Sequence, residues 1–342
     1  MSSNRESALL IVTLLATLGV VGGGLWWLKE HLTFVSEPIA TSLSPNSTKI
    51  NGNCQIANAP SGLFSYGGST TWAVIRQKTE PIIAQICPAF RLRYTDPTSK
   101  PPGSQAGIEM LIDNQLAFSQ SSNSLKPEDY QKAQAKGFSL KEVPVAIDGL
   151  VIAVHPQLQI SGLSVGQLSD IYTGKVKNWN QLGGPNLKIT PYSRTQESGG
   201  TVDFFSENVL QNQKFGSNVK YVYSTTPALR QVAADPGGIY YASASEIVHQ
   251  CEIKPLPLFN NAQQLIPPYQ EPFVPLSACP QQRNQINQIA FRIGTYPITR
   301  RLFVIVKLNS QVDEQAGDAY AQWLLTSQGQ ETLKKAGFIR LN

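Results

Sequence analysis

The chain has 342 residues, of which 41% are hydrophobic and 15% are charged, so it can bury one or two ordinary cores and is not disordered throughout. Its formal net charge of +5 favours the approach of an anionic ligand. Because the sequence contains no Lys/Arg block and no basic residues interleaved with aromatic ones, it does not indicate nucleic-acid binding.

An apolar segment near the N-terminus predicts membrane association. Residues 8–28 carry no charge and are long enough to cross the hydrocarbon core. Arg5 precedes the segment and Trp26-Trp27 ends it, which places the rest of the chain outside the cytoplasm. We assign residues 1–35 to an anchor or a signal segment. The lack of a small-x-small site after Trp27 favours an uncleaved anchor. A buried core helix is the remaining alternative.

The segment that follows is interpreted as a linker. Residues 36–62 are rich in Ser, Pro, Asn and Thr, and the folded domain is expected to begin near Leu63. Beyond it, apolar β-branched runs alternate with helix-like segments, which is typical of open α/β sheets covered by helices. The strongest strand signals are residues 143–154 and 302–306.

The sequence places hydroxyl side chains in three loops beside predicted strands or helices: residues 66–71 with Ser69 and Thr70, 103–107 with Ser104, and 118–122 with Ser122. Such turns expose unpaired amides, and their hydroxyls can cap a helix or donate to an anion. Each loop alone is equally well explained as a capped turn. Three loops at corresponding junctions favour one shared anion site.

A fourth loop, residues 194–201, is more specific. Its glycines, Gly199 and Gly200, allow close approach of a ligand, and Ser198 adds a hydroxyl. Arg194 supplies a planar set of donors suited to oxyanions. The alternative is a flexible glycine turn beside a surface arginine.

A Pro-rich stretch from Leu256 to about Gln285 predicts a long ordered loop, and two helices are expected after it. In the first, residues 319, 320, 323 and 324 share one face. Ser327 and Gln330 form a capping-box signal for the second, which is expected to close at Gly337.

All four cysteines follow the apolar segment, in a compartment expected to be oxidising. Sequence proximity favours the disulfides Cys54–Cys87 and Cys251–Cys279, although the pairing does not follow from sequence. Zinc binding is the alternative, but no two cysteines have the spacing of a zinc knuckle.

Signatures of an enzyme are scarce. The three histidines, His31, His155 and His249, are isolated from one another, and there is no G-x-S-x-G elbow or P-loop. We therefore expect a binding protein rather than an enzyme, with no catalytic residue, no metal and no cofactor.

Several segments resemble the phosphate-binding proteins of ABC-type phosphate uptake, which have the type 2 periplasmic binding fold. The similarity covers residues 60–342. It is carried by GLSVGQLSDIYTGK from Gly162 with Asn178-Trp179, GIYYAS from Gly238, YPITRR from Tyr296 followed by LFVIV, and the ending QWLLTSQGQETLKKAGF.

This resemblance implies an α/β fold of two lobes with hinge-connected open sheets. It assigns lobe one to about 63–146 and 251–342, and lobe two to about 147–250. By position, it implies ligand contacts from Ser69, Thr70, Ser104, Ser122, Arg194, Ser198, Gly199 and Gly200.

Two positions depart from the family pattern. Ser122 and Gln196 stand where relatives usually carry Asp. The first Asp is expected to accept a hydrogen bond from protonated phosphate and so to exclude sulfate-like anions. A hydroxyl can donate or accept, so Ser122 predicts weaker discrimination or a different ligand. Glu197 is a possible substitute acceptor.

The resemblance implies an extracytoplasmic receptor for phosphate or a similar small oxyanion, which delivers its ligand to an ABC transporter permease. We expect a periplasmic or extracytoplasmic location, anchored to the cytoplasmic membrane by residues 8–28. The alternatives are a membrane-tethered sensor or partner-binding protein that reuses the fold, and a hydrolase.

Overall fold

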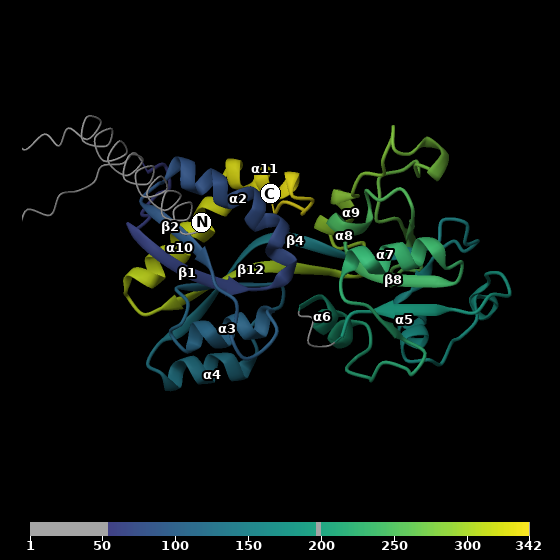
Figure 1. Ribbon diagram of the computed structural model, residues 1–342, viewed down its shortest axis with the longest axis horizontal. Helices are drawn as coiled ribbons and strands as arrows, with labels where there is room; N and C mark the ends of the chain where they lie inside the picture. The colour runs from purple at the N-terminus through teal and green to yellow at the C-terminus, as the bar shows by residue number, and fades with distance from the viewer. Residues whose placement is uncertain (1–53, 196–199, 342) are drawn as a thin grey trace, which may run out of the picture. The chain divides into compact units, whose positions relative to one another are not determined.

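The computed structural model describes residues 54–195 and 200–341 (Figure 1). The expected anchor at 8–28 and most of the expected linker lie outside these ranges. Within them, no helix combines the length and apolarity needed to cross a bilayer. The two predicted disulfides, Cys54–Cys87 and Cys251–Cys279, are both present and are therefore confirmed.

Lobe one is an α/β layer built on three parallel strands. The strand order is β2-β1-β3-β12-β4, in which β12 is antiparallel to β3 and to β4. The strands are β1 (Gly62–Gly68), β2 (Phe90–Tyr94), β3 (Phe118–Ser121), β4 (Ser139–Val154) and β12 (Thr299–Leu308).

Helices cover both faces of this sheet. One apolar cluster packs the sheet against α2, α10 and α11, and a second packs it against α3 and α4. Figure 1 shows these two groups of helices on opposite sides of the strands. The helices are η1 (Thr70–Trp72), α2 (Ala73–Ile86), α3 (Ser104–Ile112), α4 (Pro127–Ala135), α10 (Val312–Leu325) and α11 (Ser327–Lys335).

Lobe two continues the sheet through the end of β4, in the order β4-β8-β6-β7, with β9 also paired to β4. A small sheet, β11-β10-β5, lies apart from this path. Its elements are β5 (Leu163–Ser164), α5 (Val165–Tyr172), η2 (Trp179–Leu182), β6 (Thr190–Ser193), α6 (Gly200–Asn208), β7 (Lys220–Tyr221), α7 (Thr225–Ala234), β8 (Gly238–Ser243), α8 (Ala244–Ile247), β9 (Lys254–Leu256), β10 (Leu258–Phe259), β11 (Leu265–Ile266), η4 (Leu276–Ala278) and α9 (Gln288–Arg292).

Two adjacent strands, β4 and β12, connect the lobes (Figure 1). Residues 139–149 of β4 pair with β12, whereas residues 150–154 pair with β8 of lobe two. The predicted strands at 143–154 and 302–306 lie within β4 and β12. The sheets are thus hydrogen-bonded through β4, which belongs to both lobes.

The lobe boundary differs from the expected one. Residues 251–342 were expected in lobe one, but the buried side chains between Ile253 and Ile298 pack in the same apolar cluster as Leu150 and Tyr172 of lobe two. The chain therefore returns to lobe one near residue 299. At the other end, Ile56 is buried in lobe one, so the folded domain includes residues before Leu63.

The two expected C-terminal helices are α10 and α11. The predicted face of α10 is buried, and Gly337 has the positive φ of 86° that suits a helix end. The capping residue of α11 is Thr326 rather than Ser327, because its hydroxyl accepts from the Gly329 amide at 3.1 Å. Gln330 instead donates to the Val145 carbonyl on β4, which ties α11 to the sheet.

Candidate functional site

Three serines predicted from separate loops meet at one edge of the lobe-one sheet. The Oγ atoms of Ser69 and Ser122 are 2.7 Å apart, and those of Ser104 and Ser122 are 3.2 Å apart. All three side chains are almost completely buried. The Ser122 amide also donates to Ser104 Oγ at 3.1 Å. We call these three residues the serine cluster.

The fold explains this convergence. Because β1 and β3 are parallel, their carboxyl ends lie side by side. Each of these strands ends one residue before a serine of the cluster. Ser104 arrives at the same edge as the first residue of α3. Close packing there requires glycine: a methyl group on Gly107 would lie 2.4 Å from the Cα atom of Gly68.

Contacts within lobe one also fix Ser69. Its amide donates to the Gln120 carbonyl at 2.8 Å, and its hydroxyl accepts from the Thr71 amide at the start of η1. The Trp72 indole then donates to the Ser121 carbonyl at 3.1 Å. The hydroxyl is therefore held by the end of β3 on one side and by a helical turn on the other.

Gly200, the first residue of α6, faces the serine cluster from lobe two. A methyl group at this position would lie 2.6 Å from Ser122 Oγ and 2.9 Å from Ser104 Oγ. A side chain at this position would have to displace these two hydroxyls. The start of α6 brings backbone amides and the positive end of the helix dipole to the hydroxyls.

Thr70 and Arg194 line a neighbouring cavity of about 740 Å³. Arg194 directly follows β6, and the Ser193 hydroxyl donates to its carbonyl at 2.9 Å. Glu246 lines the same cavity and was not predicted from sequence. The pKa of the Glu246 carboxyl is raised chiefly by burial, and its hydrogen bond to Thr225 and the charge of Arg194 oppose this shift.

The structure thus brings together Ser69, Ser104, Ser122 and Gly200, and it places Thr70 and Arg194 at the adjoining cavity. Ser198, Gly199, the departure Gln196 and the possible substitute acceptor Glu197 lie outside the described residues. The assignment of all eight residues to a ligand remains a prediction.

An ion pair between β4 and β12 lies beside the serine cluster and was missed from the sequence. Arg300 donates to Asp148 Oδ2 through Nε at 3.0 Å and Nη2 at 2.8 Å, and both side chains are buried. The sequence did indicate that Asp148 needs a partner, because this residue interrupts an apolar strand and a buried carboxylate must be paired. Nothing in the sequence named Arg300 as that partner.

A second ion pair crosses between the lobes at the surface. Lys126 Nζ lies 3.1 Å from Glu207 Oε1 on α6. The hydrogen bond to Glu207 raises the pKa of Lys126. Asp203, on the same helix, has its pKa raised chiefly by burial, with Lys126 and Arg300 opposing the shift.

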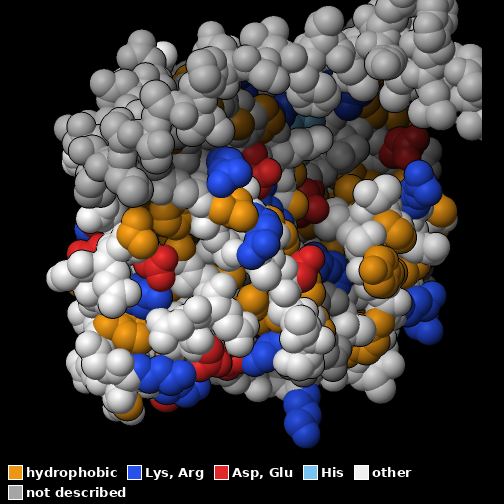
Figure 2. Space-filling model, turned by 60° about the vertical axis from the view of Figure 1, so that its left-hand side comes forward, with side chains coloured by type: hydrophobic (Ala, Val, Ile, Leu, Met, Phe, Trp, Pro, Cys, Tyr) orange, Lys and Arg blue, Asp and Glu red, His pale blue; other side chains and the backbone are white. Residues whose placement is uncertain are grey.

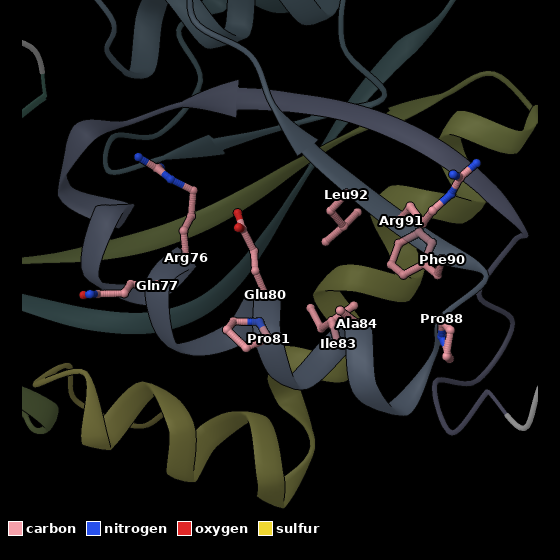
Figure 3. A pocket seen from close by; sticks show the side chains of 10 residues that line it. All are labelled: Arg76, Gln77, Glu80, Pro81, Ile83, Ala84, Pro88, Phe90, Arg91 and Leu92. Carbon is pink, nitrogen blue, oxygen red and sulfur yellow. The ribbon is translucent and has the colours of Figure 1, made fainter. Parts of the chain in front are cut away.

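A separate cavity in lobe one is lined by none of the predicted ligand residues. This cavity, of about 490 Å³, lies between α2 and the edge strand β2. Figure 3 shows the side chains that line it, among them Glu80, which accepts a hydrogen bond from the Tyr66 hydroxyl. On the face in Figure 2, basic side chains lie among acidic and apolar ones rather than in a continuous field. No group of three or more His, Cys, Asp or Glu among the described residues could hold a metal ion.

Sequence comparison identifies similar proteins over most of the chain. Residues 55–328 match the family described as a PBP superfamily domain. The phosphate-binding protein PstS of Staphylococcus epidermidis is 26% identical over 76% of this chain and 75% of its own length. The protein of the same name from Staphylococcus haemolyticus is 26% identical over 80% of this chain and 79% of its own.

Solved structures share the fold. A substrate-binding protein from Clostridium perfringens with bound phosphate aligns with a TM-score of 0.63 at 21% identity, covering 82% of this chain and 100% of that one. An ABC-type phosphate transport receptor from Vibrio cholerae gives 0.62 at 20% identity, covering 81% and 99%. These similarities establish the two-lobed α/β architecture.

Proposed function

The chain belongs to the PBP superfamily, and on that premise we propose that it is an extracytoplasmic receptor for inorganic phosphate or a similar small oxyanion. In this proposal it delivers the ligand to an ABC transporter permease, as expected from the phosphate-transport proteins that it resembles in sequence and fold. It acts by binding rather than by catalysis.

One observation carries the proposal: the serine cluster of lobe one faces the first residue of α6 in lobe two. Hydroxyls and helix-start amides are donors suited to an oxyanion, and Arg194 adds a guanidinium at the adjoining cavity. We assign ligand contacts to Ser69, Thr70, Ser104, Ser122, Arg194, Ser198, Gly199 and Gly200.

Binding in this arrangement involves an exchange of hydrogen bonds. The serine hydroxyls bond to one another, and Gly200 packs directly against them. An anion therefore enters when the lobes part, and its oxygens replace neighbouring hydroxyls as acceptors. Closure around the ligand then desolvates the contacts, which strengthens them.

The position of Ser122 governs selectivity in this proposal. A carboxylate at this place would repel any anion without a proton to share, whereas a hydroxyl accepts or donates. We therefore propose that phosphate and sulfate bind with similar affinity at neutral pH.

Calorimetric titration of the purified full-length chain with phosphate, sulfate and a neutral sugar tests this function. We expect both anions to bind and the sugar not to bind. Phosphate binding that is much tighter than sulfate binding would assign the acceptor role to another group, for which Glu246→Gln is the next variant. Binding of neither anion would refute the receptor function.

The transport role and the membrane anchor need separate tests. Purification of the chain from its native membranes, with the permease components as co-purifying partners, distinguishes a transport receptor from a sensor that reuses the fold. Retention of the chain in the membrane fraction after alkaline extraction supports an uncleaved anchor at residues 8–28. Its release contradicts that proposal.

A further inference from the structure

Arg300 is buried beside the cleft and hydrogen-bonds to groups of both lobes, and the proposed function gives it no role. It lies on β12, directly opposite Asp148 on β4, where the two strands connect the lobes. The side chain is only 2% exposed, and the side chain of Asp148 is fully buried. The Ser243 hydroxyl also donates to the second carboxylate oxygen of Asp148, Oδ1, at 2.5 Å.

Beyond its contacts with Asp148, Arg300 donates hydrogen bonds to both lobes. Nη1 donates to the Gly200 carbonyl at 3.0 Å. Nη2 donates to the Oγ1 atoms of Thr71 in lobe one and Thr201 in lobe two, both at 3.1 Å. These two threonine hydroxyls are themselves 3.2 Å apart. One guanidinium thus joins η1 of lobe one to the first turn of α6.

We propose that Arg300 is a positioning residue that holds the start of α6 against the serine cluster and so stabilises the closed arrangement of the lobes. Arg300 itself does not contact the ligand. Asp148 fixes the plane of the guanidinium, and Thr71, Thr201 and the Gly200 carbonyl are the groups that it holds together. The effect on affinity rests on the proposed function, whereas the effect on closure does not.

The chemistry requires arginine. A guanidinium presents donors in a fixed planar fork, so Nε and Nη2 can bind one carboxylate while Nη1 and Nη2 reach other acceptors. A lysine in this place can retain the charge opposite Asp148. It cannot span the same acceptors, because its three donors share a single nitrogen.

The test compares Arg300→Lys with Arg301→Lys, the same change at the adjacent exposed position. Spin labels at the exposed positions Lys78→Cys in lobe one and Lys177→Cys in lobe two report the interlobe distance without ligand. Stopped-flow kinetics with inorganic phosphate reports the association and dissociation rates.

We expect Arg300→Lys to broaden the interlobe distances and to raise the dissociation rate about tenfold or more, with the association rate nearly unchanged. Arg301→Lys should match the parent in both measurements. Distances and dissociation rates equal to those of the parent would overturn the proposal. If the parent binds no phosphate, the receptor function fails, and the distance measurement alone still decides the role of Arg300.

A second variant covers the case in which Arg300→Lys does not fold. Replacing Thr71 and Thr201 together by Val removes two acceptors while the buried pair of Arg300 and Asp148 stays intact. It should reproduce the broadened distances. A distance distribution identical to that of the parent would refute a bridging role for Arg300.

Discussion

The two walls of the cleft hold their polar groups in different ways. On the lobe-one wall, the ends of β1 and β3 and the start of α3 fix the serine cluster, and its hydroxyls bond to one another. On the lobe-two wall, Gly200 is held in place through its carbonyl by Arg300, which comes from a connecting strand. The polar groups of one wall are thus held within a single lobe, whereas Gly200 of the other wall is held by a side chain that bonds to both lobes.

The two walls differ in what they can contribute to binding. In the proposed function, the hydroxyls of lobe one would determine which anion fits, because they provide donors and acceptors at fixed positions. Arg194 and the start of α6, in lobe two, would then provide the charge and the helix dipole that retain the anion. Variants on the two walls should therefore differ in kind as well as in size.

The largest expected effect is that of Arg194→Ala on the lobe-two wall. Truncation removes a charge-assisted contact from a closed cleft and should cost about 2–5 kcal/mol of oxyanion affinity. Calorimetry with phosphate measures it, with the exposed Arg230→Ala as the control for loss of positive charge. A loss below about tenfold, or 1.4 kcal/mol, would remove Arg194 from the site.

Gly200→Ala tests the close approach of the walls. The added methyl group would lie within 3.0 Å of two cluster hydroxyls, and overpacking of this kind costs about 1–3 kcal/mol. We expect about a tenfold loss of phosphate affinity. The control is Gly166→Ala, where the nearest atom to the new methyl group is 3.8 Å away. Unchanged affinity would mean that the walls do not meet at Gly200.

Ser122→Asp changes the lobe-one wall and should alter selectivity. A carboxylate among the hydroxyls opposes an unprotonated anion by like-charge repulsion, so the ratio of phosphate to sulfate affinity should rise by at least about tenfold at neutral pH. The exposed Ser124→Asp adds the same charge outside the cluster. An equal change of the ratio in both variants would indicate a general charge effect instead.

The smallest effect is expected at the surface pair of Lys126 and Glu207. Glu207→Gln should weaken closure by about 0.2–1 kcal/mol, and by less at high salt, because exposed pairs are screened. The pKa of Lys126 is raised above its ordinary value of 10.5. The contribution of the pair is therefore fully present below 10.5 and disappears as the pH rises through the folded-state pKa.

Interlobe distances measured against pH check this prediction. The parent should lose part of its closed population only above pH 10.5, whereas Glu207→Gln should show no such step. A step of equal size in both proteins would exclude the ion pair as its cause.

The convergence of the three serines could be predicted because each serine lies in a short sequence pattern that can be recognised without knowing the fold. Hydroxyl residues beside strand and helix ends are readable from a few residues, and parallel strands bring such ends to one edge. The predicted capping residue of α11, Ser327, was wrong by one position, because neighbouring Thr326 has the same kind of hydroxyl and is the actual cap.

Long-range features were less accessible. Asp148 and Arg300 are 152 positions apart. A carboxylate in an apolar strand indicates that a partner exists but does not identify which residue it is. The lobe boundary was missed for a similar reason. The apolar residues scattered between Ile253 and Ile298 in a proline-rich segment do not reveal which core they join, and packing against β4 decides it.

The most direct test of the account is a crystal structure of the chain grown with phosphate. We predict one anion between the lobes, bonded by the hydroxyls of Ser69, Ser104 and Ser122 and by backbone amides at the start of α6. A neutral or cationic molecule in that place, or a phosphate bound away from the serine cluster, would contradict the account.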